Sequence, residues 1–411
     1  MKRRTFLQAT AVLAAPAIAR ADAAAIKVGV LAPLTGVVAA GGKEMVDGVK
    51  LYVEQSGGKI ADRPVQLVVE DDGANPDVAL QKARRLVEQE KVDFLIGDLL
   101  ANTGLAVANY VKGNGMPYFI PIIAADDLTQ RARIPNVIRV AGYSASQFSH
   151  PFGDWAAKQG YKRAVTISQD YTFGHEQCGG FAQVFTESGG QITQQFWHPL
   201  NTADFSPYLG QIAELKPDAV FFMETGADAT RLIQQASSFG LKDQTKLIGC
   251  MNATDQSVIR TMNGEADGIV AAAHFAEGAD IPATQAFVKA YESKYQVIPS
   301  LYGFSMYSGI MWVAKALETV GGRTDDRDAF LAAVLKTKLD GSPLGKTVSL
   351  DSYGNPIYDV YIRTVKKRAD GKYWNVPTQT YPNVSQFWTY DPVTYMQQPP
   401  YSRSFQGIKK S

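Results

Sequence analysis

The sequence is poor in the residues that bind metals or cross-link a chain. Its 411 residues include only two cysteines, Cys178 and Cys250, and four histidines. No CxxC, HxH or HxxxH spacing occurs, so the patterns that usually hold a metal ion are missing. Two well-separated cysteines do not form a disulfide scaffold. We therefore expect no metal, no cofactor, and two free thiols that are mostly buried.

The chain also lacks an excess of either charge. It carries 41 Lys and Arg against 40 Asp and Glu, a formal net charge of +1. This balance provides neither a basic surface for nucleic acid nor a polybasic patch for lipid. No stretch beyond the N-terminus approaches the roughly 20 apolar residues of a membrane-spanning helix. The composition predicts a globular protein, and the length predicts about two domains.

The first residues are typical of an export signal. Residues 1–21 combine a basic start, an apolar run and a small-x-small cleavage pattern at Ala19–Ala21. Arg3-Arg4 and the following Thr-Phe-Leu resemble a twin-arginine signal, the alternative being the basic region of an ordinary signal peptide. Both routes predict a periplasmic location. A twin-arginine substrate folds in the reducing cytoplasm, which is why we expect both cysteines to be free.

Strand-like and helix-like segments alternate along the chain. The apolar run Val28–Leu31 precedes a segment with Met45, Val46, Val49 and Val53 at helical spacing. Residues 92–98 are nearly all apolar, as expected of a strand buried on both faces of a parallel sheet. The alternation restarts near residue 141 and ends with a strand at 358–367. It predicts an α/β fold with two doubly wound parallel sheets.

The glycine-containing loop after the first strand does not match a nucleotide-binding loop. A P-loop requires Gly, four residues, then Gly-Lys-Ser/Thr. Here Gly42-Lys43 is followed by Glu44, Val37 stands where the first glycine should be, and no GxGxxG is present. We interpret the glycines as allowing the loop to pass close to another group at the helix start.

Motifs for catalysis are not found either. The sequence has no GxSxG nucleophile elbow. The acidic run Glu70–Asp72 ends a predicted strand just before a turn, where carboxylates are usually solvated or cap the backbone. We therefore predict no catalytic residues and no enzymatic activity.

Seven segments together resemble one protein family. In order, they are IKVGVLAPLTG, VEDDGANPDVALQKARRLV, VDFLIG, GMPYFIP, QDYTFGHE, LKPDAVFF and ADGIVAAAHF. Their order and spacing resemble the periplasmic solute-binding proteins of ABC importers, in the branched-chain amino-acid-binding family with the type I periplasmic-binding fold. The resemblance covers Ile26 to about Val365. The C-terminal tail is similar to that of a subgroup proposed to bind aromatic compounds.

The resemblance implies two lobes joined by a three-crossing hinge, with the ligand in the cleft between them. Lobe 1 would comprise residues 26–141 and 276–347, and lobe 2 residues 142–275 and 348–380. Residues 381–411 would form an ordered tail on the surface. The implied partners are a small-molecule ligand and the membrane permease subunits of an ABC importer, and we expect a monomer. A ligand-sensing subunit for a receptor is the alternative role.

One end of the ligand is expected at Ala101, Asn102 and Thr103, which align with residues that hold a ligand carboxylate in the family. The alternative is that Asn102 or Thr103 only caps the helix. Ile122 and Ala124 align with a segment that completes the amino-acid seat in the family.

Met251 aligns near the family acid that pairs with an α-ammonium. An unpaired buried ammonium would cost several kcal/mol, which argues against an ordinary α-amino acid. Glu224 or Asp170 is the alternative source of an acid.

The remaining candidates favour a flat apolar ligand. These are the aromatic residues Tyr143, Tyr171, Phe173 and Phe275, each of which alone is more often a core residue. Thr225 offers one hydroxyl, and His175 is interpreted as a surface or capping residue. We predict a small aromatic carboxylate of the benzoate or hydroxycinnamate kind. The alternative is an aliphatic or branched-chain amino acid, or an amide.

Overall fold

The computed structural model describes residues 24–408 and contains two β-sheets. The first has the strand order β2-β3-β1-β4-β5-β6. Its strands are β1 (Ile26–Ala32), β2 (Lys59–Ile60), β3 (Arg63–Asp71), β4 (Phe94–Gly97), β5 (Tyr118–Phe119) and β6 (Val137–Ile138). The pairs from β3 to β6 are parallel, and β2 is an antiparallel edge strand.

The second sheet has the order β13-β12-β11-β10-β9-β7-β8. Its strands are β7 (Arg163–Gln169), β8 (Gln191–His198), β9 (Ala219–Met223), β10 (Lys246–Gly249), β11 (Val270–Ala273), β12 (Tyr358–Lys367) and β13 (Tyr373–Val384). Strands β7 to β11 are parallel, whereas β12 and β13 form an antiparallel hairpin at one edge. The predicted α/β class with two mostly parallel sheets is confirmed, with antiparallel edges that were not predicted.

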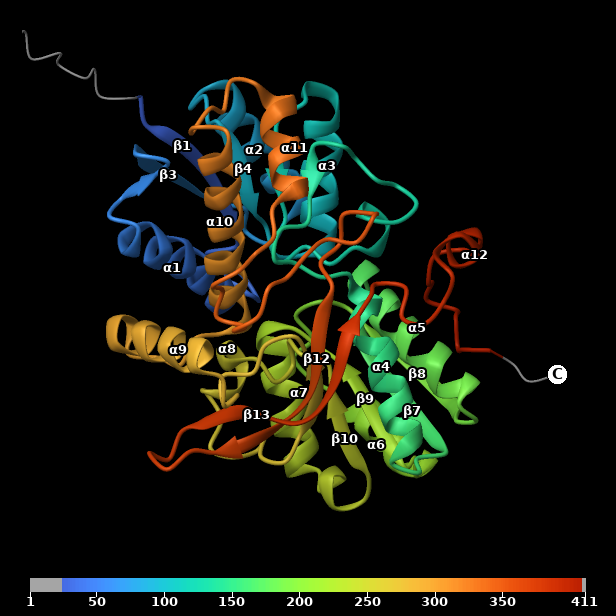
Figure 1. The fold of residues 1–411 in the computed structure, drawn as a ribbon. Coiled ribbons are helices and arrows are strands. Elements are labelled where there is room, and N and C mark those ends of the chain that lie inside the picture. Colours follow the sequence, from blue (N-terminus) through green and yellow to red (C-terminus); the bar gives the residue numbers. More distant parts are fainter. Residues whose placement is uncertain (1–23, 409–411) are drawn as a thin grey trace, which may run out of the picture.

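Helices flank both sheets, and we call each sheet with its helices a lobe (Figure 1). The first lobe carries α1 (Ala39–Gln55), α2 (Pro76–Glu88), α3 (Ala101–Asn114), α10 (Leu301–Thr319), α11 (Arg327–Lys336) and the 3-10 turn η1 (Asp126–Leu128). The second carries α4 (Ala145–Lys158), α5 (Thr172–Glu187), α6 (Ser206–Leu215), α7 (Gly226–Ser238), α8 (Gln256–Ile259) and η2 (Leu241–Asp243). Helix α9 (Pro282–Tyr295) lies near the junction of the lobes, and α12 (Pro392–Gln397) belongs to the C-terminal segment.

The chain passes between the two sheets three times. It leaves the first sheet after β6, leaves the second after β11, and returns to the second before β12. This is the connectivity that a three-crossing hinge requires. The division at residues 141, 275 and 347 stays a prediction.

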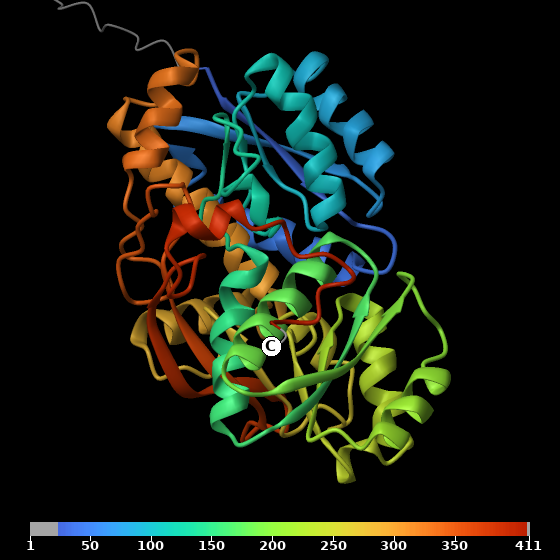
Figure 2. The same ribbon diagram turned by 90° about the vertical axis from the view of Figure 1, so that its right-hand side faces the viewer.

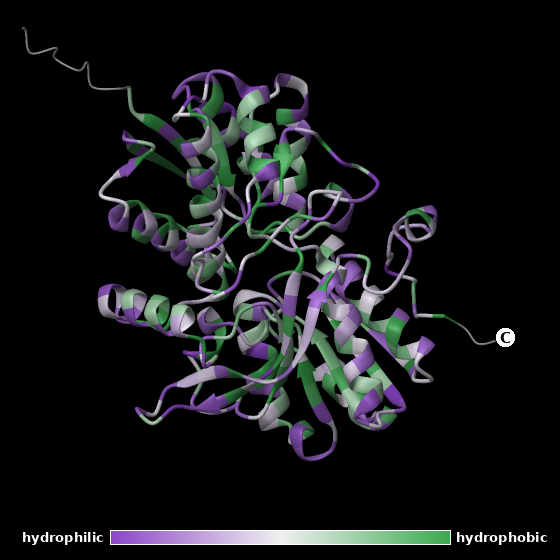
Figure 3. Ribbon diagram, viewed as in Figure 1, coloured by the Kyte–Doolittle hydropathy of each residue, from purple (hydrophilic) through white to green (hydrophobic). Residues whose placement is uncertain are grey.

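Local sequence explains why most of these elements form. Helix α2 begins where the Asn75 side chain accepts hydrogen bonds from the N–H groups of Asp77 and Val78, with Pro76 in the first turn. All four residues of β4 are buried, which accounts for its lack of polar alternation. Figure 3 shows the same pattern across the molecule, with apolar strands inside and polar positions on the outer faces of the helices.

Glycines in α1 permit close packing against the backbone. Gly42 lies in the first turn of α1, and a Cβ there would be 1.9 Å from the carbonyl oxygen of Pro33. A Cβ on Gly48 would lie 2.2 Å from the carbonyl oxygen of Gly303 in α10. The close approach at Gly42 is to the neutral carbonyl of Pro33, and Gly42 itself lies in α1 and not in the preceding loop.

Residues 381–408 contain secondary structure and contact both lobes. Strand β13 runs across the expected boundary at residue 380, and α12 follows. Phe387 and Tyr395 are buried. Gln386 accepts a hydrogen bond from Thr129 of the first lobe at 2.9 Å, and Tyr401 pairs with His150 of the second at 2.8 Å. Figure 2 shows this segment passing over the junction of the lobes.

Cys178 and Cys250 are both buried and are not joined by a disulfide, as expected from the sequence. Within residues 24–408, no helix combines the length and apolar character needed to cross a bilayer.

The glycine packing generates a test of stability. Gly48→Ala should lower the free energy of unfolding by about 1–3 kcal/mol, because the added methyl group must push α1 away from α10. Urea unfolding measures this change. The matched control is Gly113→Ala in α3, where a Cβ meets open space. That variant should raise stability by up to about 1 kcal/mol. Equal effects of the two substitutions would contradict the packing argument.

Candidate ligand-binding site

A small pocket lies between the lobes, at the carboxyl ends of strands from both sheets. Its cavity volume is about 10 Å³, close to the space that a single water molecule needs. The lining residues are Leu99, Ala101, Ile122, Ala124, Tyr143, Tyr171, Phe173, Thr225 and Asn252. None of these side chains is charged. The pocket is therefore apolar and aromatic, with a few hydroxyl and amide groups.

A larger hollow of about 600 Å³ lies on the outer surface. It is bordered by α8, the end of α9 and the β12–β13 turn, and its lining includes Arg260, Lys367 and Asp370. It does not lie at the carboxyl ends of the parallel strands, where open α/β sheets bind ligands. We therefore assign the candidate site to the enclosed interlobe pocket.

The pocket brings together most of the residues expected from the sequence. Those that line it are Ala101, Ile122, Ala124, Tyr143, Tyr171, Phe173 and Thr225. Sequence reasoning missed Leu99 and Asn252. Leu99 lies two positions before Ala101, and Asn252 directly follows Met251. Their position just after a strand was the signal that could have identified them.

Four expected residues do not line the pocket. Thr103 is turned inward, where its hydroxyl contacts Asp98 and the carbonyl of Leu100. Phe275 stacks on Phe304 with ring centroids 4.2 Å apart. Met251 is buried, and its carbonyl oxygen accepts a hydrogen bond from Arg363 at 2.8 Å. Asn102 lies in the first turn of α3, and its side chain is absent from the lining.

Neither Asn102 nor Thr103 caps α3, contrary to the alternative considered from the sequence. The N-cap is Leu100, which makes no side-chain cap. Among residues 24–408, no group accepts a hydrogen bond from the N–H groups of Ala101, Asn102 and Thr103. A helix N-terminus carries about half a positive charge, so open N–H groups favour an anion.

Two further helices begin at the pocket. The N-cap of α5 is Tyr171 and that of α7 is Thr225, and neither makes a side-chain cap. The N–H of Ala227 in α7 donates to the carbonyl of Val37 at 3.1 Å, so this helix start is partly used by the first lobe. Three helix dipoles therefore favour negative charge in a pocket that has no Lys, Arg or His in its lining.

The acids considered from the sequence lie outside the pocket. Glu224 Oε1 is 2.8 Å from Nε2 of His198, and both side chains are fully buried. Burial raises the pKa of Glu224 to about 7, against the opposing effect of the hydrogen bond with His198. Asp170 contacts His175 at 2.8 Å and Arg403 at 3.3 Å. His175 thus forms a hydrogen bond with Asp170 and does not line the pocket.

The lobes touch each other around the pocket, which makes this a closed arrangement. Several polar contacts join residues of the first lobe to residues of the second. Among them are Val37 O with Ala227 N at 3.1 Å, Tyr302 Oη with Asn252 Nδ2 at 2.9 Å, Leu301 N with Asp255 Oδ2 at 2.7 Å, and Glu44 with Arg260 at 2.6 Å.

An aromatic cluster surrounds His274, just after β11. The His274 ring lies 5.1 Å from Phe148 and 4.6 Å from Tyr358, measured between centroids. Within the described part of the chain, neither ring nitrogen has a hydrogen-bond partner. Burial, with a smaller effect of Arg363, lowers the pKa of His274 to about 3. His274 is therefore held as a neutral ring in the core beside the pocket residue Tyr143.

Comparisons with known proteins agree with this geometry. Residues 25–372 match the sequence family described as periplasmic binding protein. Leu/Ile/Val-binding protein homolog 6 of Brucella melitensis is 29% identical over 387 residues, covering 92% of this chain and 97% of that protein.

Two similar solved structures are solute binding proteins of ABC transporters. One, from R. palustris, is in complex with benzoate. It has a TM-score of 0.82 and 29% identity, and the match covers 88% of this chain and 97% of that one. The other, from Rhodopseudomonas palustris BisB5, is in complex with 3,4-dihydroxy benzoic acid. It has a TM-score of 0.83 and 30% identity, with coverage of 88% and 98%.

The environment of His274 predicts how stability depends on pH. The pKa of His274 is lower in the folded state than in the unfolded chain. Its contribution to the free energy of unfolding is therefore fully present above the unfolded pKa of 6.5 and is lost as the pH falls toward 3. The loss should be about 1.4 kcal/mol per pH unit. His274→Phe should keep the ring packing and remove this pH-dependent contribution. Between pH 6.5 and 4.5, the free energy of unfolding should therefore fall by about 2–3 kcal/mol less in the variant than in the wild type. Urea unfolding at both pH values measures it, and equal losses would contradict the assignment.

Proposed function

This chain belongs to the periplasmic binding protein family, and from that membership we propose that it captures a small aromatic carboxylate for an ABC importer. As a member of this family it is a solute-binding protein and not an enzyme. The finer assignment concerns its ligand, and one observation carries it. An uncharged pocket with aromatic walls ends at the open N-terminus of α3.

The two chemically different ends of the proposed ligand would match different parts of the pocket lining. The carboxylate would accept hydrogen bonds from the N–H groups of Ala101, Asn102 and Thr103. The ring would lie against the apolar and aromatic walls, formed by Ile122, Tyr143, Tyr171 and Phe173. Thr225 would face a ring substituent. Two similar solved proteins, in complex with benzoate and 3,4-dihydroxy benzoic acid, support this chemistry.

The energy available is sufficient for useful affinity. Burial of a single ring contributes roughly 3 kcal/mol at about 25 cal/mol per Å². A charge-assisted hydrogen bond adds about 1.5–3 kcal/mol. After the costs of association, micromolar binding is within reach.

A branched-chain amino acid is the second candidate, because a similar curated protein is named a Leu/Ile/Val-binding protein homolog. Its ammonium group would need a carboxylate partner in the pocket. The lining contains none, and Glu224 and Asp170 are engaged elsewhere. The geometry therefore favours the aromatic acid.

Location and partners follow from the same proposal. The protein would act in the periplasm as a monomer and deliver its ligand to membrane permease subunits; a receptor-sensing role would use the same pocket. The expected export signal at residues 1–21, including the twin-arginine motif, lies outside the residues that the structure describes.

The ligand assignment predicts selective stabilisation by aromatic acids. In a thermal-shift assay, benzoates or hydroxycinnamates at saturating concentration should raise the melting temperature by several degrees, because they bind only the folded state. Leucine, valine and short amides should have no effect. Stabilisation by leucine with none from any aromatic acid would overturn the proposal.

A matched pair of variants tests the carboxylate seat within this prediction. Ala101→Pro removes one N–H at the first position of α3, where proline is tolerated, and Leu100 already has the extended backbone required before proline. Ala101→Val adds bulk at the same place but keeps the N–H. Ala101→Pro should weaken benzoate binding more than Ala101→Val, as measured by calorimetry. Equal losses would show that bulk, and not the N–H, matters.

The contacts between the lobes generate a prediction about motion. We expect the lobes to separate without ligand and to close over it, because the enclosed pocket has to open for entry. Small-angle scattering should show a smaller radius of gyration at saturating ligand than in the ligand-free protein. An unchanged radius under saturation would contradict closure.

A further inference from the structure

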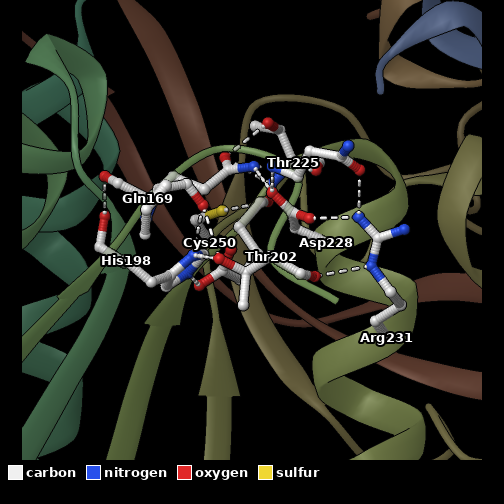
Figure 4. Close-up of polar contacts among 11 residues, drawn as sticks. Gln169, His198, Thr202, Thr225, Asp228, Arg231 and Cys250 are labelled. Atoms are coloured by element: carbon white, nitrogen blue, oxygen red, sulfur yellow. Dashed lines mark hydrogen bonds and ion pairs between the residues drawn. The ribbon is translucent and has the colours of Figure 1, made fainter. Parts of the chain in front are cut away.

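A chain of hydrogen bonds leads from the pocket into the second lobe (Figure 4). The Thr225 hydroxyl, at the pocket wall, lies 2.7 Å from Gln169 Oε1. Gln169 Nε2 donates to Asp228 Oδ2 at 2.6 Å. Asp228 Oδ1 pairs with Arg231 at 2.6 Å. Thr225, Gln169 and Asp228 are all buried, so water does not compete for these contacts.

The orientation of the Gln169 amide is determined by its neighbours. The backbone N–H of Thr225 points at Gln169 Oε1 at 3.2 Å, and the carboxylate of Asp228 faces Nε2. Turning the amide over would place its NH₂ group against an N–H and its oxygen against a carboxylate. Both contacts would be repulsive, so the oxygen faces Thr225.

Asp228 holds the far end of this chain as an acceptor. Its Oδ2 accepts from Gln169 and also from the backbone N–H of Asn201 at 2.8 Å, while Oδ1 accepts from Arg231. Every partner of the carboxylate is a donor. Because a carboxylate has no proton to donate, Gln169 must be the donor in its hydrogen bond with Asp228.

The consequence for Thr225 is that its only proton is already used. An amide oxygen cannot donate, so the hydroxyl must donate to Gln169 Oε1. The Thr225 oxygen keeps two lone pairs, which can accept hydrogen bonds. Thr225 can therefore offer a ligand only a hydrogen-bond acceptor.

We propose that Thr225, oriented by Gln169 and Asp228, selects aromatic carboxylates that carry a hydrogen-bond donor on the ring, such as a hydroxyl group. This inference rests on the proposed function, because it concerns the end of the same ligand away from α3. A ring without a substituent leaves the Thr225 oxygen without a hydrogen-bond donor. A substituent that can only accept would place a second acceptor against the Thr225 oxygen. Gln169 and Asp228 are positioning residues that act through Thr225.

The test compares three benzoates whose ring substituents differ in hydrogen bonding. Affinities are measured by calorimetry. 4-Hydroxybenzoate carries a hydrogen-bond donor, 4-fluorobenzoate carries a group of similar size that cannot donate, and 4-formylbenzoate carries only an acceptor. The 3-substituted isomers are measured as well, so that the ring position nearest Thr225 is sampled. The wild type should bind the hydroxyl compound of the better isomer about tenfold more tightly than its fluoro analogue, and the formyl compound least tightly.

Two variants separate the role of Thr225 from that of Gln169. Thr225→Val should reduce the ratio of hydroxyl to fluoro affinity to about one. Gln169→Met leaves Thr225 in place but frees its proton, so the formyl compound should gain affinity relative to the fluoro compound. A purely structural role for Gln169 would not produce that reversal. The matched control is Thr193→Val, a partly buried residue of β8 outside the pocket lining, which should keep the wild-type ratios.

The outcomes distinguish this inference from the proposed function. If benzoates bind the wild type without preference for the hydroxyl group in either isomer series, the role of Thr225 is wrong and the proposed function stands. Unchanged ratios in Thr225→Val would overturn the inference in the same way. If no benzoate binds the wild type at all, the proposed function fails and this inference fails with it.

Discussion

The structure depends on one geometric constraint, the direction of its parallel strands. Parallel strands bring their carboxyl ends to a single edge of a sheet, and the following helices begin at that edge. In this protein two such edges face each other. Residues after β4, β5, β7, β9 and β10 therefore meet in one pocket, although the first and the last of them lie more than 150 positions apart in the chain. The same geometry directs three helix starts at that pocket.

This arrangement provides positive potential without a positive side chain. Backbone dipoles are fixed by the helices, so they cost no side-chain entropy when an anion arrives. Charged groups near the pocket are kept behind its walls. Glu224 is paired with His198, and Asp98 contacts Thr103. Burial, reinforced by the nearby Asp72, raises the pKa of Asp98 well above its usual range, which favours a neutral carboxyl there. The pocket interior is thus left to aromatic walls and a few directed polar groups.

The C-terminal segment adds a second connection between the lobes. Gln386 contacts Thr129 in the first lobe, and Arg131 donates to the carbonyl oxygens of Gln398 and Tyr395. Farther along, Gln195 of β8 donates to the carbonyl of Phe405. Any change in the angle between the lobes must therefore also move or deform this segment. The hinge involves the tail as well as the three crossings.

The sequence by itself determined the alternation of strands and helices, because each of those elements has its own local periodicity and caps. It also determined which strand ends carry the pocket residues. It did not predict β13, whose two prolines and polar residues suit an edge strand held by pairing with β12. The tertiary structure alone decided which side chains line the pocket. Thr103 turns toward Asp98, Phe275 stacks on Phe304, and Asn252, not Met251, lines the pocket. The direction of a side chain just beyond a strand depends on the conformation of the turn and on packing against the opposite lobe. Neither of these can be derived from the local sequence.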